Sequence, residues 1–302
     1  MFHPRTDLAM ESFDASGESA FPGVQVNHWD ASDVSMTEVL IQDPESARQL
    51  GKPCGAYLTL ECPLLRQHDP EARMAVSSLL GEELARMIHS GDESPVLVIG
   101  LGNRFITPDS LGPRTMDRTL VTRHMIGAGF APEHMRSVCA IAPGVLGVTG
   151  IETMEMISGL VERVQPGAVL CIDSLAARDS SRIGSTVQLT DTGIQPGAGV
   201  GNRRAPLNRE TLGVDVIALG MPTVVYAATL ARDAFAALSK DVSDEELEHI
   251  ERGLLGEDIG EMIVTPREID ALVQDAAGMI ASGINRALHP KLSDAEIAAM
   301  MD

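Results

Sequence analysis

The sequence predicts an α/β protein with a mainly parallel sheet flanked by helices on both faces. Two short apolar runs, Val96–Ile99 and Ala168–Ile172, are typical of strands buried on both faces. Segments with helix-capping signals alternate with such runs, which indicates strand–helix–strand units. Gly100 and Gly102 follow the first run and allow a sharp turn beyond the carboxyl end of its strand. Open α/β sheets bind their ligands at that edge.

The composition limits the possible partners and the cellular location of the protein. A chain of 302 residues with 44% hydrophobic residues can bury a sizeable core. The net charge of -20 argues against a nucleic-acid partner held through its phosphates. The four cysteines form no CxxC pair and are expected to be reduced. The sequence offers neither a run of about 20 apolar residues nor the apolar core of a secretion signal, so no membrane contact and a cytoplasmic location are expected.

The first half of the chain contains several expected elements. Residues 1–50 are polar and are expected to form an extended, partly loose arm. They are followed by a strand at 54–61, a helix from 70 to about 89 opened by Asp69 and Pro70, the strand 96–99, a helix from Asp109 to about 126, and a strand at 137–142.

The second half continues the alternation and ends in helices. We expect a glycine loop at 143–150, a helix at 153–164, a strand from 168 that ends at Asp173, a strand at 186–189, a loop at 191–202, a strand at 214–219 and a helix that begins at Pro222. Capping boxes at 243–246, 265–268 and 293–296 predict further helices.

Acidic residues follow the apolar strands. Asp109 and Asp173 each come after a buried-strand run or its glycine turn, and Asp191 opens a loop. Because neighbouring parallel strands deliver their carboxyl ends to one edge, Asp109 and Asp173 can meet there. Two close carboxylates share one proton, so one member can accept a proton from water and the other can donate one. Such a pair can hydrolyse a peptide with neither a metal nor a covalent intermediate.

Other interpretations stay open at this point. An Asp after a strand is often only a helix cap. Asp191-Thr-Gly matches the tripeptide of pepsin-like enzymes but is also a good turn signal. The glycine-rich segment 196–202 could serve a phosphate-binding module, although it lacks the Gly-Lys-Ser/Thr of a Walker loop. A metal-dependent peptidase is a further alternative, although we can assign few ligands.

Blocks along nearly the whole chain together resemble the germination protease family of endospore-forming bacteria. They are Arg5–Ala9, Gly100–Pro113, Ala142–Thr153, Ile172–Arg178, Thr190–Asn202, Gly220–Val225, Thr265–Asp270 and Asn285–Pro290.

The resemblance implies a fold similar to that of hydrogenase-maturation peptidases, in the phosphorylase/hydrolase-like group. It implies that Asp109 and Asp173 are catalytic, in an atypical aspartic-type endopeptidase with no cofactor. Asn103, Asp191 and Gly193 lie in the matching blocks and are further candidate site residues. The alternative within this resemblance is a metal-dependent peptidase of the hydrogenase-maturation type.

The resemblance also implies the substrates, the assembly and the processing of the enzyme. The substrates would be small acid-soluble spore proteins, degraded in the spore core at germination by a homotetramer. The enzyme would be a zymogen that cleaves itself between Asp7 and Leu8, which divides the chain into a propeptide, 1–7, and a single α/β peptidase domain, 8–302. The short arm would occupy the cleft until acidification allows the cut.

Three positions depart from the family pattern. Tyr226 stands where the resemblance implies Asp, and Ser110 and Ser174 stand where it implies alanine. A serine beside each carboxylate could donate a hydrogen bond to it and lower its pKa.

Overall fold

The computed structural model describes residues 6–14, 21–91, 93–130, 132, 135–197, 201, 204–238, 260 and 262–301. The strands are β1 (Val24–Ala31), β2 (Val34–Ile41), β3 (Gly55–Glu61), β4 (Val96–Gly100), β5 (Val138–Ile141), β6 (Ala168–Ala177), β7 (Thr186–Thr190), β8 (Asp215–Tyr226) and β9 (Ile263–Val264). The α-helices are α1 (Ala9–Asp14), α2 (Pro44–Leu50), α3 (Pro70–Met87), α4 (Leu111–Met116), α5 (Arg123–Gly127), α6 (Leu146–Thr149), α7 (Thr153–Val164), α8 (Arg209–Leu212), α9 (Ala227–Leu238), α11 (Ile269–Leu288) and α12 (Asp294–Met301). Short 3-10 turns are η2 (Pro63–Gln67), η3 (Thr107–Asp109) and η4 (Ser180–Arg182).

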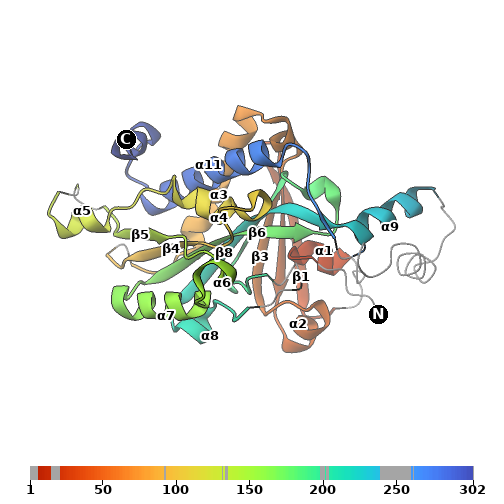
Figure 1. Cartoon of the computed structure of the whole chain (residues 1–302), viewed down its shortest axis with the longest axis horizontal. Coiled ribbons are helices and arrows are strands. Elements are labelled where there is room, and N and C mark those ends of the chain that lie inside the picture. Colours follow the sequence, from red (N-terminus) through yellow and green to blue (C-terminus); the bar gives the residue numbers. More distant parts are fainter. Residues whose placement is uncertain are drawn as a thin grey trace.

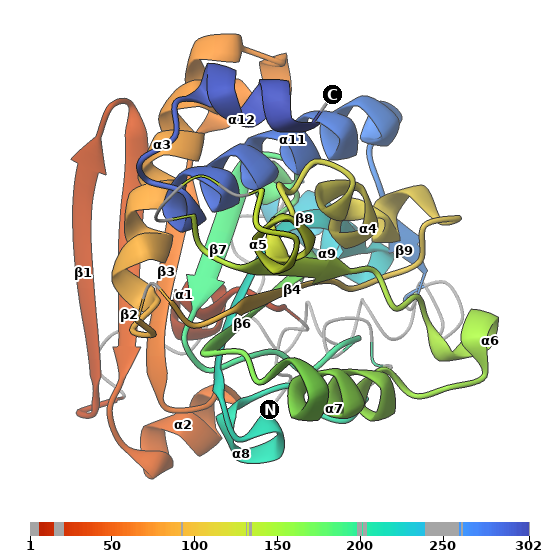
Figure 2. The same cartoon turned by 90° about the vertical axis from the view of Figure 1, so that its left-hand side faces the viewer.

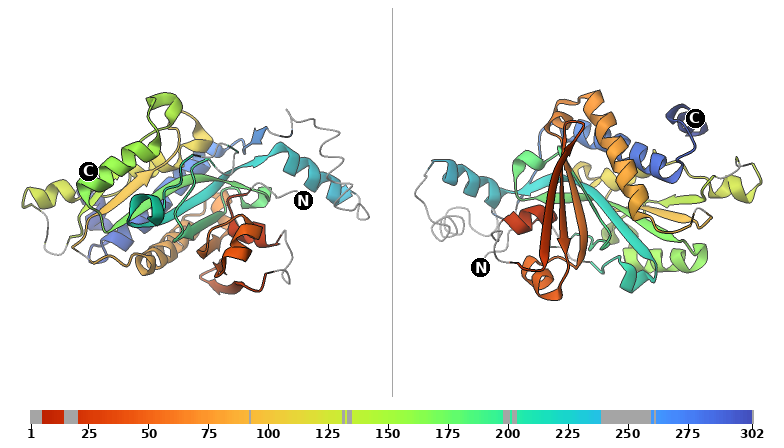
Figure 3. Two further views of the ribbon diagram at one scale, coloured as in Figure 1. Left: turned by 90° about the horizontal axis from the view of Figure 1, so that it is seen from below. Right: turned by 180° about the vertical axis from the view of Figure 1, so that it is seen from behind.

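One mixed sheet runs through the molecule and confirms the α/β class. Its order is β1-β2-β3-β7-β8-β6-β4-β5, and β9 pairs with β8. The strands β8, β6, β4 and β5 pair in parallel, whereas β1, β2, β3 and β7 pair antiparallel with one another and with β8. We call these two groups the parallel half and the antiparallel half. Figure 3 shows β1–β3, in red and orange, standing together at one edge of the sheet.

Helices cover both faces of the parallel half because its strands are apolar on both sides. In β4, Val96 and Val98 belong to the core cluster shared with α3 and α11, while Leu97 and Ile99 belong to the cluster shared with α7. This alternation at consecutive residues is what a strand with two buried faces requires. Figures 1 and 2 show α3, α4 and α11 on one face and α7 and α8 on the other.

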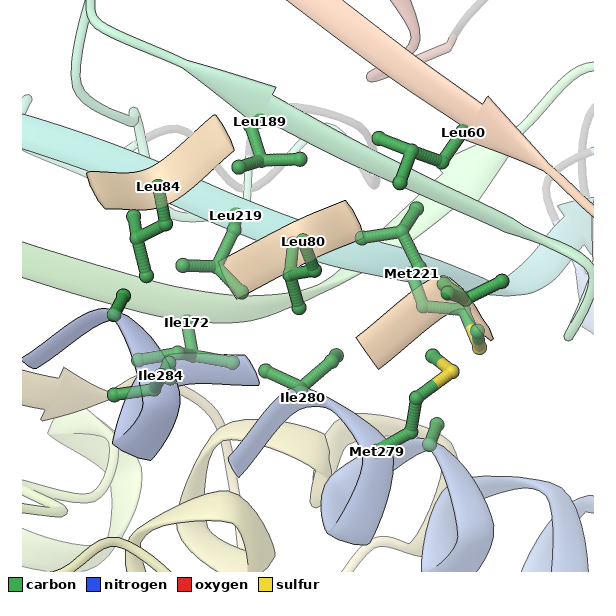
Figure 4. Packing of buried hydrophobic residues seen from close by; sticks show 14 of the residues in the cluster. Leu60, Leu80, Leu84, Ile172, Leu189, Leu219, Met221, Met279, Ile280 and Ile284 are labelled. Atoms are coloured by element: carbon green, nitrogen blue, oxygen red, sulfur yellow. The ribbon is translucent and has the colours of Figure 1, made fainter. Parts of the chain in front are cut away.

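The largest core cluster lies between the sheet and the pair α3–α11. Leu80 and Leu84 of α3 and Ile280 and Ile284 of α11 point at strand residues such as Ile172 (Figure 4). Each of these five side chains is fully buried. Burying such a side chain contributes about 1.5–3 kcal/mol, so this layer fixes the sheet on which the site is built.

The predicted caps give mixed results. The carboxylate of Asp69 accepts hydrogen bonds from the amides of Glu71 and Ala72, so the start of α3 is confirmed. Ser293 and Glu296 cap α12 reciprocally. The box at 265–268 is wrong, because α11 begins at Ile269 and the side chain of Glu268 caps nothing there. The box at 243–246 lies outside the described residues.

The expectation of a loose arm over residues 1–50 is wrong for most of that segment. It contains α1, the hairpin of β1 and β2, and α2. The alternation of β2, in which Val34, Met36, Val39 and Ile41 are buried, was a readable strand signal. So was the Asp43-Pro pair that caps α2.

The single helix expected from Asp109 to about 126 is also wrong. The chain forms η3, α4 and α5 with a break after α4. In the break, the Leu120 amide donates to Asn285 Oδ1 at 2.9 Å, and the Thr122 amide donates to the Val138 carbonyl at 3.0 Å. Partners far away in the sequence therefore take the backbone bonds that a continuous helix would have made.

Two strands run further than the sequence indicates. β6 continues to Ala177, so Asp173 lies inside a strand and not at its end. β8 continues through Pro222, where a helix was expected to begin, and the helix α9 begins only at Ala227. The β6–β8 register shifts at Leu175/Ala176, opposite this proline, as expected for a residue that lacks an amide hydrogen.

Candidate active site

The first candidate carboxylate, Asp109, is held by the turn after β4. The Asn103 amide donates to Asp109 Oδ2 at 2.8 Å, and the Asp109 amide donates to the Ile106 carbonyl at 2.9 Å. The segment 101–109 thus folds back on itself, and Asp109 returns to the end of the strand that precedes it. The aspartate caps its own loop while one carboxylate oxygen stays available.

Gly102 makes this turn possible. Its φ is +104°, and a Cβ placed there would lie 2.1 Å from the Asp109 carbonyl oxygen. Real Cβ atoms do not approach backbone that closely, so any side chain would push the Asp109 backbone outward. The position of the carboxylate therefore depends on a glycine at 102.

The second candidate carboxylate, Asp173, lies within β6 and is only 7% exposed. The Ser174 amide donates to Asp173 Oδ1 at 2.8 Å. Asp173 is in register with Gly220 of β8, which in turn is in register with Gln188 of β7. Asp173 and Gln188 therefore lie on the same face of the sheet, with Gly220 between them.

A cavity of about 790 Å³ brings the two carboxylates together. Asp109 and Asp173 line it from the parallel half of the sheet, and Lys52 and Gln188 line it from the antiparallel half. Asp7 lines the same cavity; it belongs to the segment before the predicted Asp7–Leu8 cut, residues 1–7, which we call the arm from here on.

The carboxylates influence each other electrostatically. Burial raises the pKa of Asp109, against the hydrogen bond from the Asn103 amide. Burial, and then the negative charges of Asp109 and Asp7, raise the pKa of Asp173 well above its ordinary range. Since two close carboxylates cannot both ionise cheaply, Asp173 is the member of the pair favoured to keep the shared proton.

The arm is docked onto the end of β6. The Asp7 amide donates to the Ala176 carbonyl at 2.9 Å, and the Ala176 amide donates to Asp7 Oδ2 at 2.8 Å. Leu8 is fully buried in an apolar cluster that includes Tyr57 and Leu175. The Asp7–Leu8 bond therefore lies between a strand edge and an apolar pocket, in the short segment that precedes α1.

Two polar side chains that sequence reasoning missed contact this bond. Lys52 Nζ donates to the carbonyl oxygens of Thr6 and Asp7 at 3.0 and 2.9 Å. Gln188 Nε2 donates to the Asp7 carbonyl at 3.1 Å, and Gln188 Oε1 accepts from the Ala9 amide at 2.7 Å. Each residue is an isolated polar position in the sequence, so no motif could have identified it.

The other predicted site residues have structural surroundings. Asn103 Oδ1 accepts from the Phe105 amide at 3.0 Å and so shapes the turn. Asp191 Oδ1 accepts from the Ala56 amide at 2.9 Å at the start of β3, and neither Asn103 nor Asp191 lines the cavity. Gly193 does line it, with a φ of +75° and a backbone close to Leu207.

The two serines do not act as expected. The Ser110 hydroxyl donates to the Thr107 carbonyl at 2.8 Å and accepts from Arg114 Nε, so it is not directed at Asp109. The Ser174 hydroxyl is buried and has no hydrogen-bond partner within the described part of the chain; its amide serves Asp173 instead. Tyr226, at the end of β8, is 6% exposed.

The metal and phosphate alternatives find little support. Over the described ranges, no group of three or more His, Cys, Asp and Glu side chains converges as a metal centre would need. Much of the glycine segment 196–202 lies outside the described residues. Among the described helices, none is long and apolar enough to cross a membrane.

Comparisons with known proteins give a consistent result. A sequence model of a family described as germination protease matches residues 6–254 and 240–301. A germination protease from Caldanaerobacter subterraneus is 40% identical over 98% of each chain, and one from Clostridium acetobutylicum is 41% identical over 97% of each. One from a Geobacillus species is 35% identical over 97% of this chain and 95% of its own. The structure is also similar to a nickel–iron hydrogenase maturation protease from Thermococcus kodakarensis, with a TM-score of 0.35 and 17% identity over 70% of this chain and 99% of that one.

Proposed function

The chain belongs to the germination protease family, and we propose that it is an endopeptidase made as a zymogen, which cleaves its own Asp7–Leu8 bond and then degrades small acid-soluble spore proteins. One observation carries the proposal. The Asp7 backbone is hydrogen-bonded to the edge of β6 and lines the same cavity as Asp109 and Asp173. The arm is thus bound as a substrate would be.

The chemistry follows from the pair of carboxylates. Ionised Asp109 would take a proton from a water molecule, whose oxygen then attacks the carbonyl carbon of Asp7. Protonated Asp173 would give its proton to the Leu8 nitrogen as the carbon–nitrogen bond breaks. The raised pKa of Asp173, caused by burial and the nearby charges of Asp109 and Asp7, favours this division of roles.

The proposal includes activation of self-cleavage by mild acid. At neutral pH, a charge on Asp7 opposes ionisation of its neighbours, as its effect on the pKa of Asp173 indicates. Mild acid adds protons to the cluster of carboxyl groups around the bond and so relieves the repulsion between them. We therefore expect self-cleavage to accelerate as the pH falls from 7 toward 5.

The cut would divide the chain into a propeptide, 1–7, and a peptidase domain, 8–302. Residues after the bond have contacts of their own with the rest of the fold: Glu11 is buried and accepts from the amides of Arg178 and Asp179 at 2.7 and 2.9 Å, besides the hydroxyl of Thr6 in the arm. Residues before the bond would then be free to leave, which opens the β6 edge to a substrate.

The direct test is to incubate the purified full chain at pH 5.5 and at pH 7.5 and to determine the new N-terminus by mass spectrometry. The proposal expects Leu8, formed faster at pH 5.5. Parallel samples with a chelator separate this mechanism from a metal-dependent peptidase, because only the latter loses activity. A chain that keeps its original start, or is cut elsewhere, contradicts the proposal.

Family membership further supports assembly into a homotetramer and action in the spore core. Light scattering of the full chain tests the first. Incubation of the processed chain with a purified small acid-soluble spore protein tests the substrate class, with unrelated unfolded protein as the control.

A further inference from the structure

The carbonyl of the Asp7–Leu8 bond has two side-chain donors. Lys52 Nζ lies 2.9 Å from its oxygen and Gln188 Nε2 lies 3.1 Å from it. Both donors come from the antiparallel half, and neither touches Asp109 or Asp173 through any hydrogen bond among the described residues. A carbonyl that receives two donors at such distances is polarised toward attack.

We propose that Lys52 and Gln188 form the oxyanion site of this enzyme, the pair of donors that stabilises the negative oxygen formed when water attacks the scissile carbonyl. The inference rests on the proposed function and deepens it, since it assigns the electrophilic part of a reaction whose acid and base are Asp109 and Asp173.

The sheet register supports this arrangement. Asp173 of β6 and Gln188 of β7 are both in register with Gly220 of β8, so they lie on one row and one face, two strand spacings apart. That separation is about 9.5 Å between backbones. The row leaves room for a peptide group and a water molecule between an acid on one side and a donor on the other. Gly220 lines the cavity on this row, and no larger residue fits there, because a Cβ would lie 2.3 Å from the Asp173 carbonyl oxygen and 2.8 Å from the Leu175 side chain.

The two donors also fix which bond is cut. Gln188 contacts both sides of the scissile bond: its nitrogen donates to the Asp7 carbonyl and its oxygen accepts from the Ala9 amide. Lys52 contacts the carbonyls of Thr6 and Asp7. Because these contacts are all to backbone, they can bind any extended peptide that replaces the arm.

Charge complements the geometry. Lys52 is one of only three lysines in the chain, and it lies among the acidic residues of the cavity. Burial lowers its pKa, while the charges of Asp7 and Glu11 act in the opposite direction. A cation there offsets the negative charge that the tetrahedral oxygen adds to a cavity already lined by the carboxyl groups of Asp7, Asp109, Glu152 and Asp173.

The step is balanced in atoms and charge. The water oxygen bonds to the Asp7 carbonyl carbon and its proton passes to the Asp109 carboxylate, while the carbonyl electron pair moves to the oxygen held by Lys52 and Gln188. When the pair returns, the bond to the Leu8 nitrogen breaks and that nitrogen takes the proton of Asp173. The products are a carboxyl group on Asp7 and an amine on Leu8.

The test measures the first-order rate of self-cleavage at pH 5.5 in full-length Lys52→Met, Lys52→Arg and Gln188→Glu. Lys52→Met keeps the shape of the stem but removes the donor, and we expect about a 10²–10³-fold loss of rate. Lys52→Arg restores a donor and should recover part of it. Gln188→Glu keeps an acceptor for the Ala9 amide, removes the donor and adds a negative charge beside the developing oxyanion, so it should slow self-cleavage as well. Lys291→Met, at an exposed lysine, is the matched control and should cleave at the normal rate.

A second readout separates catalysis from anchoring. Hydrogen exchange at the Asp7 and Ala9 amides reports whether the arm stays docked, and thermal unfolding reports whether the variant is folded. A slow variant with a protected arm supports the oxyanion site. A slow variant with an exposed arm shows that Lys52 is only an anchor, and a variant with normal rate shows that it is neither; both overturn the inference.

Failure of the inference is distinguishable from failure of the proposed function. If the unaltered chain forms no Leu8 terminus, the proposed function fails with it. If the unaltered chain is processed and the Lys52 and Gln188 variants match its rate, only the oxyanion assignment falls. Should Lys52→Met not fold, Gln188→Glu decides.

Discussion

The two halves of the sheet contribute different parts of the site. The parallel half supplies Asp109 and Asp173, held by loop and strand backbone. The antiparallel half supplies Lys52 and Gln188, whose side chains contact the arm. In the proposed mechanism the parallel half supplies the acid, the base and a strand edge for the peptide, whereas the antiparallel half supplies the donors to the peptide carbonyl groups, and the two halves meet at the cavity.

The halves also differ in how they are stabilised. The parallel half is apolar on both faces and is covered by α3 and α11 on one side and α7 on the other. The antiparallel half carries the arm and α1 on one face, where the apolar cluster includes Leu8 and Phe13. A support for the carboxylates that is covered on both faces therefore stands beside a surface that holds the N-terminal segment.

The largest expected effect is in the parallel half. Asp109→Asn or Asp173→Asn should each slow self-cleavage by at least about 10³-fold, because an amide can neither accept the proton of water nor supply one. Both variants should keep the fold, which circular dichroism can verify. Asp117→Asn, at an exposed carboxylate paired with Arg104, is the matched control. Near-normal turnover in both site variants would mean that the pair is misassigned.

Gly102→Ala tests how far the position of Asp109 depends on its turn. The added Cβ meets the Asp109 carbonyl oxygen at 2.1 Å and strains a φ of +104°, so the carboxylate must move. We expect about a 10²-fold slower self-cleavage, since a displacement near 1 Å can have that effect. Gly147→Ala, at a glycine with open space around it, is the control. Equal rates for the two variants would refute the dependence.

Asp173→Asn should also change stability with pH. The pKa of Asp173 is raised in the folded protein above its ordinary value of 3.8, through burial and then the charges of Asp109 and Asp7. The folded state thus binds more protons than the unfolded state above pH 4, and stability falls as the pH rises through the raised pKa. The variant escapes this penalty, so its unfolding midpoint should exceed that of the unaltered chain at pH 7, with a smaller difference at pH 4.

Asp117→Asn should change the pH dependence of stability in the opposite direction. The hydrogen bond from Arg104 lowers the pKa of Asp117, so its stabilisation is present at neutral pH and is lost in acid. Denaturant unfolding of both variants at pH 7, pH 4 and about pH 2.5 gives the comparison, because the contribution of Asp117 is lost only below its ordinary pKa of 3.8. A midpoint for Asp173→Asn that falls below that of the unaltered chain at pH 7 would contradict the burial argument.

The smallest effect is expected at Asp191, in the antiparallel half. Its carboxylate accepts one hydrogen bond from the Ala56 amide, at an exposed site outside the cavity lining. Asp191→Ala should lower the free energy of unfolding by about 0.5–1.5 kcal/mol and leave the self-cleavage rate unchanged. A large loss of rate would give Asp191 a role in the reaction and would break the division between the two halves.

Several elements could be predicted because their signals are local. The apolar run of β4, the Asp69-Pro70 start of α3 and the helix α7 are encoded by neighbouring residues. The meeting of Asp109 and Asp173 could also be expected, since parallel strands direct their carboxyl ends to one edge. Where local signals were weak or misread, as in the hairpin of β1 and β2, the expectation was wrong.

Long-range pairing decided the rest. β8 passes through Pro222 because β6 lies beside it, against the local preference of a proline to open a helix. The helix expected after Asp109 breaks because Asn285, from α11, takes one of its backbone bonds.

The sequence by itself determined the α/β class and indicated Asp109 and Asp173 as a pair, because both depend on residue types in short stretches; the bond at Asp7–Leu8 stays a prediction from the family resemblance. Only the tertiary structure brought Lys52 and Gln188 to that bond, since both are single polar residues from distant elements. The physical reason is that a hydrogen bond across a sheet depends on strand register, and register is set by the packing of the whole core and not by the residues that form the bond.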